Sequence, residues 1–129
     1  MIIAVGDLEL LVRGADKQAP AAARRFVGEW SKDHGIDDAY TAQLIASELV
    51  TNSILHGEPP IVVRVVMDES DGLPVIEVED SGDGSPIVQP ESDTATDGRG
   101  LVLVAALAKE WGTRPLRSGG KVTWGKCAL

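Results

Sequence analysis

The stretch SELVTNSILHGEPP, residues 47–60, marks the place where a helical pattern ends and an extended pattern begins. Up to this stretch, apolar residues recur at the three- and four-residue spacing of a helix. The letters GEPP then end the helix, because proline removes a backbone donor and cannot continue it. Beyond them, runs rich in Val and Ile are typical of strands. We therefore expect a helix to end at about His56 and a sheet to follow it.

Helices and strands are predicted in groups along the chain and not in strict alternation. Residues 2–13 read as one strand or a short hairpin, and further extended runs cover 61–67, 73–80 and two segments around Ser118-Gly119-Gly120. Helical spacing covers 21–34, a segment from a cap at Asp37 to about His56, and 98–112, which is apolar nearly all round and is expected to be buried. This grouping favours an α+β fold, a two-layer sandwich whose largely antiparallel, mixed sheet carries about three helices on one face.

Residues 81–97 lack the pattern of either a helix or a strand. They contain two prolines and many small or acidic residues, and they have no Lys or Arg before Arg99. Such a composition cannot supply a core element, so we expect a mobile loop there.

Composition excludes several classes of function. The 129 residues suffice for one domain, which we expect to span 1–129, and the formal charge is −8. An acidic chain without a Lys/Arg cluster argues against binding nucleic acid or an anionic membrane surface. It does not argue against a nucleotide, because amides and a metal ion can hold phosphates locally. With no membrane-length apolar run, no signal peptide and a single cysteine, Cys127, we expect a cytoplasmic protein without disulfides.

The helix that ends at His56 carries a polar stripe. Glu48, Asn52 and His56 recur at every fourth position and therefore share one face, with leucines on both sides. An unpaired buried carboxylate is costly, so the stripe needs polar partners: one another, sheet backbone or a ligand. The opposite face is expected to meet solvent; it carries Gln43, Ser47 and Thr51.

Two glycine clusters follow downstream. EDSGDGSP places Asp80 at the end of an apolar strand and Gly82 and Gly84 just after it, where a backbone without Cβ atoms can approach a ligand. A buried strand-end acid can accept a hydrogen bond from the amine of a purine, although an ordinary Asp-Gly turn explains the same letters. TDGRGLVLV sets Gly98 and Gly100 before a helix, which suits either a phosphate site or a simple helix cap.

The combined order is far more specific than its parts. The chain resembles the GHKL ATPase superfamily, the Bergerat fold, in the order of three motifs: E-x-x-x-N-x-x-x-H, then D-x-G-x-G, then G-x-G-L. ELVTNSILHG looks like the N box of this superfamily, DSGDG like its first glycine box and GRGL like its second. The resemblance covers about residues 15–129. Within the superfamily the chain looks most like the small, single-domain anti-sigma-factor serine/threonine kinases, the RsbW/SpoIIAB-like group, on SELVTNSILHG, GRGLVLVAALAKEWG and GGKVTWGKCAL.

The resemblance implies a role for each motif residue. Asn52 would ligate Mg²⁺, Glu48 would be the general base toward the attacking hydroxyl, and His56 would approach the phosphates. Asp80 would accept from the adenine amine, with Thr123 helping through a water molecule. The two glycine boxes would supply the remaining contacts to ATP: Gly82 and Gly84 beside the base, and Gly98, Arg99, Gly100 and Leu101 at the phosphates.

The same resemblance implies partners. Such a protein would bind Mg·ATP, sequester a sigma factor and phosphorylate a serine on a small anti-anti-sigma protein of the STAS type; this branch also forms homodimers. Two alternatives stay open, an ATP-binding interaction module with little or no kinase activity and a catalytic fragment that works with a separate phosphotransfer domain. The acidic loop 81–97 is compatible with the first alternative, because it adds no positive charge near the phosphates.

Overall fold

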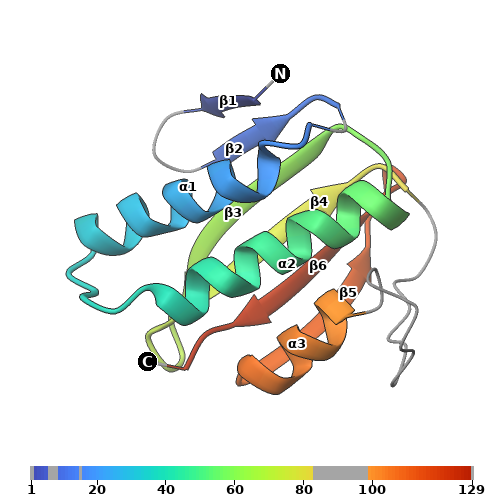
Figure 1. Ribbon diagram of the computed structural model, residues 1–129. Coiled ribbons are helices and arrows are strands. Elements are labelled where there is room, and N and C mark those ends of the chain that lie inside the picture. Colours follow the sequence, from blue (N-terminus) through green and yellow to red (C-terminus); the bar gives the residue numbers. More distant parts are fainter. Residues whose placement is uncertain (1, 6–8, 15, 83–98, 129) are drawn as a thin grey trace.

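The computed structural model describes residues 2–5, 9–14, 16–82 and 99–128 and shows two layers, a sheet with helices on one of its faces (Figure 1). Within these residues the sheet has six strands, in the spatial order β1 (Ile2–Val5), β2 (Glu9–Val12), β3 (Ile61–Asp68), β4 (Leu73–Asp80), β6 (Lys121–Lys126) and β5 (Glu110–Pro115). Each neighbouring pair of these described strands is antiparallel. The expected α+β sandwich is confirmed, with an antiparallel sheet in place of a mixed one.

The helices differ from expectation mainly at their ends. They are α1 (Ala19–Asp33), α2 (Tyr40–His56) and α3 (Arg99–Leu107). Pro20 lies in the first turn of α1, where its missing N–H costs nothing. The expected cap at Asp37 is wrong: α2 begins at Tyr40, whose backbone N–H donates to Asp38 Oδ1 at 3.1 Å.

The prediction of a helix as far as residue 112 is also wrong. The chain leaves α3 after Leu107, and β5 begins at Glu110 because its residues pair with β6. In this pairing Trp111 lies opposite Gly125 and Trp124 opposite Gly112, and the Trp124 ring packs over Gly112, where a Cβ would lie 3.0 Å from it. Pairing within this hairpin thus overrides the helical pattern of residues 110–112.

Helix α3 is also not buried all round. Leu101 and Val104 are fully buried, whereas Val102 is 40% exposed. The helix packs against α2 and β5 and has solvent on its other side. The neighbouring elements therefore bury only part of the apolar surface of α3.

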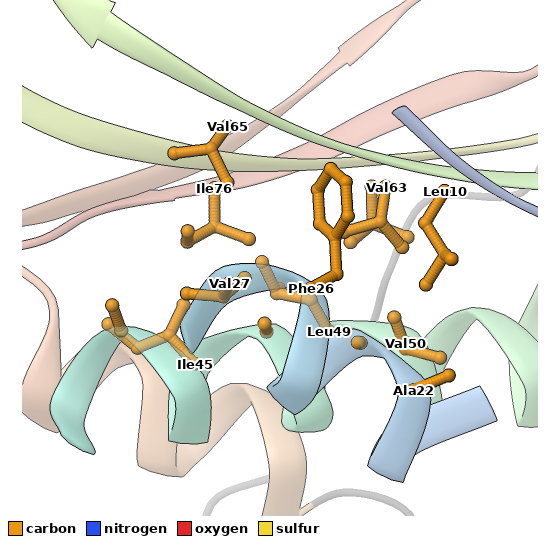
Figure 2. Packing of buried hydrophobic residues seen from close by; sticks show 14 of the residues in the cluster. Leu10, Ala22, Phe26, Val27, Ile45, Leu49, Val50, Val63, Val65 and Ile76 are labelled. Carbon is orange, nitrogen blue, oxygen red and sulfur yellow. The ribbon is translucent and has the colours of Figure 1, made fainter. Parts of the chain in front are cut away.

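Helix α2 lies between α1 and α3 and crosses the sheet over β3 and β4 (Figure 1). The main core fills the space between α1, α2 and the sheet, and each fully buried Leu, Ile or Phe contributes roughly 1.5–3 kcal/mol. Figure 2 shows how side chains from both layers meet there: Leu10, Val63, Val65 and Ile76 from strands, and Ala22, Phe26, Val27, Ile45, Leu49 and Val50 from helices.

The central position of α2 removes the solvent face that its sequence suggested. Ser47 is buried, and Gln43 and Thr51 are half-buried. Helix α1 covers this side, and Gln43 Nε2 donates across it to the Arg24 carbonyl at 2.8 Å. The two hydroxyls donate to carbonyls of α2 itself, so this buried polar face is satisfied inside the protein.

The described part of the chain holds no helix that is both long and apolar enough to cross a membrane.

Candidate functional site

The end of α2 and the end of β4 meet at one edge of the sandwich. Gly57, which follows α2, packs against the Asp80 side chain, and a Cβ on Gly57 would lie only 2.5 Å from the Asp80 Cγ and Oδ2. Next to this contact the Ser81 N–H donates to the Glu58 carbonyl at 2.8 Å. The folded chain therefore joins the polar stripe and the first glycine box, which are far apart in the sequence.

Asp80 is the most deeply buried acid of this region, with 0% of its side chain exposed. Its Oδ1 accepts two hydrogen bonds, from the Gly82 N–H at 2.9 Å and from Lys121 Nζ at 3.0 Å. Its Oδ2 is buried and has no hydrogen-bond partner among the residues that the structure describes. Buried polar atoms are normally paired, so this carboxylate oxygen is available to a donor from outside the described residues.

A second orphaned oxygen belongs to Thr123. The register of β6 sets Thr123 opposite Val78 and Lys121 opposite Asp80, so Thr123 and Asp80 are diagonal neighbours on the same face of the sheet. Thr123 is 0% exposed, and its Oγ1 also has no partner within the described ranges. The face is the one that the helices cover, because Val78 belongs to the core between the layers. An acceptor and a hydroxyl are therefore available side by side.

The polar stripe of α2 changes its exposure along its length. Asn52 is buried, Glu48 is half-buried and His56 is exposed in the last turn. The amide of Asn52 makes no hydrogen bond to any residue in the described part of the chain. The inward position expected for the stripe therefore holds for Asn52 alone.

Sequence reasoning missed several residues of this region. Nothing in the sequence around Lys121 indicates a role in the site, because only the register between β4 and β6 shows that this lysine lies opposite Asp80. Gly57 looked like a helix stop, and its close approach to Asp80 depends on tertiary structure. Gly120 has φ +90°, a conformation that favours glycine, and lies against the Asp80 carbonyl. Ser53 is buried on α2, with its Oγ unpaired among the described residues.

Both glycine boxes are described only in part. Gly84 of the first box and Gly98 of the second lie outside the described residues. Of the expected loop 81–97, only Ser81 and Gly82 are described. Arg99 and Gly100 are the first residues of α3. The Leu101 side chain is fully buried and anchors the start of this helix in the core. A contact of Leu101 with a ligand would therefore use its backbone.

No group of three or more His, Cys, Asp or Glu side chains suited to a metal ion occurs within the described ranges. Mg²⁺ takes oxygen ligands and usually keeps several waters, so a nucleotide can supply much of its coordination. The Asn52 amide oxygen and phosphate oxygens form a chemically suitable set. The orphaned oxygens of Asp80 and Thr123 likewise suit the polar edge of a base.

Within the described ranges an antiparallel sheet carries three helices on one face, an α+β sandwich that is consistent with the GHKL ATPase fold. Residues 14–124 match the family model of the histidine kinase-like ATPase domain, and the chain therefore belongs to this family. Comparison with curated proteins gave no match. Family membership supports ATP binding and, in general terms, an ATPase or phosphotransferase activity.

Proposed function

We propose that this chain is a single-domain Mg·ATP-binding regulatory kinase of the anti-sigma type, with its nucleotide site where α2, β4 and β6 meet. The observation that supports it best is the buried Asp80 Oδ2, which lacks a partner within the described residues. An ionised carboxylate only accepts hydrogen bonds, and adenine presents an exocyclic amine that donates. Thr123 Oγ1, equally unpaired in that part of the chain, would complete the contact directly or through water.

The cation would be held at Asn52. This residue lies less than two turns before Gly57, or about 8 Å along the helix axis at 1.5 Å per residue. A base at Asp80 therefore leaves its phosphates free to extend along α2 toward the amide. The amide oxygen would complete a Mg²⁺ shell made mostly of phosphate oxygens and water.

Glu48 would act as the general base. It lies one turn before Asn52 on the same face and is half-buried, and the described residues offer its carboxylate no ion-pair or hydrogen-bond partner. Bound ATP supplies the phosphoryl group. Glu48 would take the proton from the attacking serine hydroxyl as its oxygen bonds to the γ-phosphorus and the bond to the ADP oxygen breaks.

The start of α3 would face the phosphates. Free backbone N–H groups at a helix N-terminus favour anions, and Gly100 with Arg99 begins this helix. Gly82 would border the base, and we propose the same for Gly84, with Gly98 at the phosphates. His56, exposed at the end of α2, would approach the phosphates from the other side.

The partners proposed here rest on the likeness of SELVTNSILHG, GRGLVLVAALAKEWG and GGKVTWGKCAL to anti-sigma-factor kinases. They are a sigma factor, a STAS-type anti-anti-sigma protein as the phosphorylated substrate, and a second copy of the chain in a homodimer, all in the cytoplasm. The alternative is an ATP-binding module of the same fold with little or no kinase activity. The absence of Lys and Arg from residues 81–98 favours this alternative.

Calorimetric titration with ADP and ATP, with and without Mg²⁺, tests the shared premise. We expect wild type to bind both nucleotides and Asn52→Ala to lose at least about tenfold of the Mg²⁺-dependent affinity, the worth of one charge-assisted contact. Ser47→Ala, on the α1-facing side of α2, is the matched control and is expected to bind normally. If the wild type binds no nucleotide, both functions are wrong.

Labelled ATP then separates the two functions. The protein is incubated with a STAS-type antagonist, and phosphoserine on the antagonist is measured. Transfer by the wild type that is lost in Glu48→Ala supports the kinase. Binding without any transfer supports the interaction module.

A further inference from the structure

Lys121 is a buried lysine whose ammonium group has a defined partner. Only 5% of its side chain is exposed, and its Nζ lies 3.0 Å from Asp80 Oδ1. Lysine is seldom fully buried unless its charge is paired, and removing one member of such a pair leaves the other uncompensated. The pair lies directly at the carboxylate that the proposed function assigns to the base.

The ion pair divides the two carboxylate oxygens into different roles. Oδ1 already accepts from both Lys121 Nζ and the Gly82 N–H, so it is occupied inside the protein. Oδ2 has no partner in the described part of the chain, and its close neighbour is Gly57, which has no side chain that could bond to it. The carboxylate therefore offers a ligand one acceptor instead of two.

One acceptor discriminates between purines. A 6-amino purine donates a single exocyclic N–H to Oδ2, whereas a 6-oxo purine would place a carbonyl oxygen against it. Guanine would need both carboxylate oxygens for its two neighbouring donors, and Lys121 already occupies one of them.

We propose that Lys121 is a positioning residue that determines base specificity: it holds Asp80 so that a single acceptor faces the base, which selects 6-amino over 6-oxo purines. This inference rests on the proposed function, because it takes the nucleotide site to be at Asp80. It adds a residue outside the three sequence motifs that define the site. A lysine that instead competes with the base for Asp80 would have the opposite effect on affinity.

The test compares the dissociation constants of ADP and inosine diphosphate, which differ at the 6-position, by calorimetry. We expect wild type to prefer ADP and Lys121→Met to reduce this preference about tenfold, since a carboxylate held only by the Gly82 N–H can shift to accept from the ring N–H of the 6-oxo base. Lys126→Met is the matched control: Lys126 is the other buried lysine of β6, it pairs with Asp68 and Asp71, and its loss is expected to leave the preference unchanged.

Each outcome decides a different point. An unchanged preference in Lys121→Met, with weaker binding of both nucleotides, means a purely structural lysine and overturns the inference alone. Tighter ADP binding in this variant means that Lys121 competes with the base and also overturns it. If the wild type binds neither nucleotide, the proposed function fails together with the inference.

A second pair of variants serves if Lys121→Met does not fold. In Asp80→Asn the donors Lys121 and Gly82 hold the amide oxygen, so the NH₂ group faces the base and we expect inosine diphosphate to bind better than ADP. The double variant Asp80→Asn with Lys121→Met leaves no unpaired buried charge, because both members of the ion pair are now neutral. It lacks one of the two donors that orient the amide introduced at position 80. We expect the reversed preference to shrink in the double variant, and an equal preference in both variants overturns the inference.

Discussion

Gly57, the residue after α2, and Asp80, the last residue of β4, are packed so closely that a Cβ at position 57 would lie 2.5 Å from the Asp80 Cγ. This contact joins the central helix to the strand that carries the candidate base-binding acid. The backbone of residue 57 has φ −103°, which any residue can adopt, so the close contact with Asp80 and not the backbone conformation requires a glycine there.

Gly57→Ala is therefore expected to displace the Asp80 carboxylate. Overpacking of this kind costs about 1–3 kcal/mol, and we expect a lower Tm together with about tenfold weaker ADP binding. Thermal unfolding and calorimetric titration measure the two effects. Gly14→Ala is the control, because a Cβ at Gly14 meets nothing within 4 Å. Normal ADP binding by Gly57→Ala would contradict the placement of the base at Asp80.

Glu48→Gln is expected to separate catalysis from binding. The amide keeps the shape of the side chain but cannot take a proton, so the phosphotransfer rate should fall by roughly 10²–10⁴ while ADP affinity stays within about twofold. Single-turnover transfer of labelled phosphate and calorimetry give the two values. Glu69→Gln, in the exposed turn between β3 and β4, is the control. Undiminished transfer by Glu48→Gln would remove Glu48 from the chemistry.

The ion-pair cluster at the other end of β6 predicts a dependence of stability on pH. Lys126 Nζ lies 2.6 Å from Asp68 Oδ2 and 3.0 Å from Asp71 Oδ2. Hydrogen bonds from Lys126 hold the pKa of both carboxyls below their ordinary value of 3.8. Because these pKa values are lower in the folded state, the stabilisation is present above about pH 4 and is lost as the pH falls through the folded values.

Lys126→Met tests this dependence. We expect its Tm to lie below that of the wild type at pH 7 and the difference to shrink steadily below pH 4, as the unfolded chains take up protons at Asp68 and Asp71 that the wild-type fold resists. Thermal unfolding followed by circular dichroism at several pH values measures it. An equal difference at pH 7 and at pH 2 would show that packing of the lysine stem, and not its charge, stabilises this corner.

Cys127 is expected to be unreactive in the folded protein. The residue is fully buried, and burial raises the pKa of its thiol to about 11. The thiolate is the reactive form, so iodoacetamide at pH 8 should label the native protein negligibly and the denatured protein completely. Mass spectrometry of both samples gives the answer. Rapid labelling of the native protein would mean that the C-terminal end opens readily.

The sequence by itself determined the elements and most of the candidate site. Local spacing of apolar residues located α1, α2 and the strands, because each pattern reports which side of one element is buried. The same spacing singled out Asn52 and Asp80, since a polar residue amid an apolar face is visible in the letters alone.

Only the tertiary structure decided what depends on residues far apart in the chain. The α1-facing side of α2 is buried because another helix covers it. Lys121 faces Asp80 through the register of two strands that lie 41 positions apart at this pair. No local pattern encodes such a pairing, because its free energy comes from contacts that form only when the sheet is assembled.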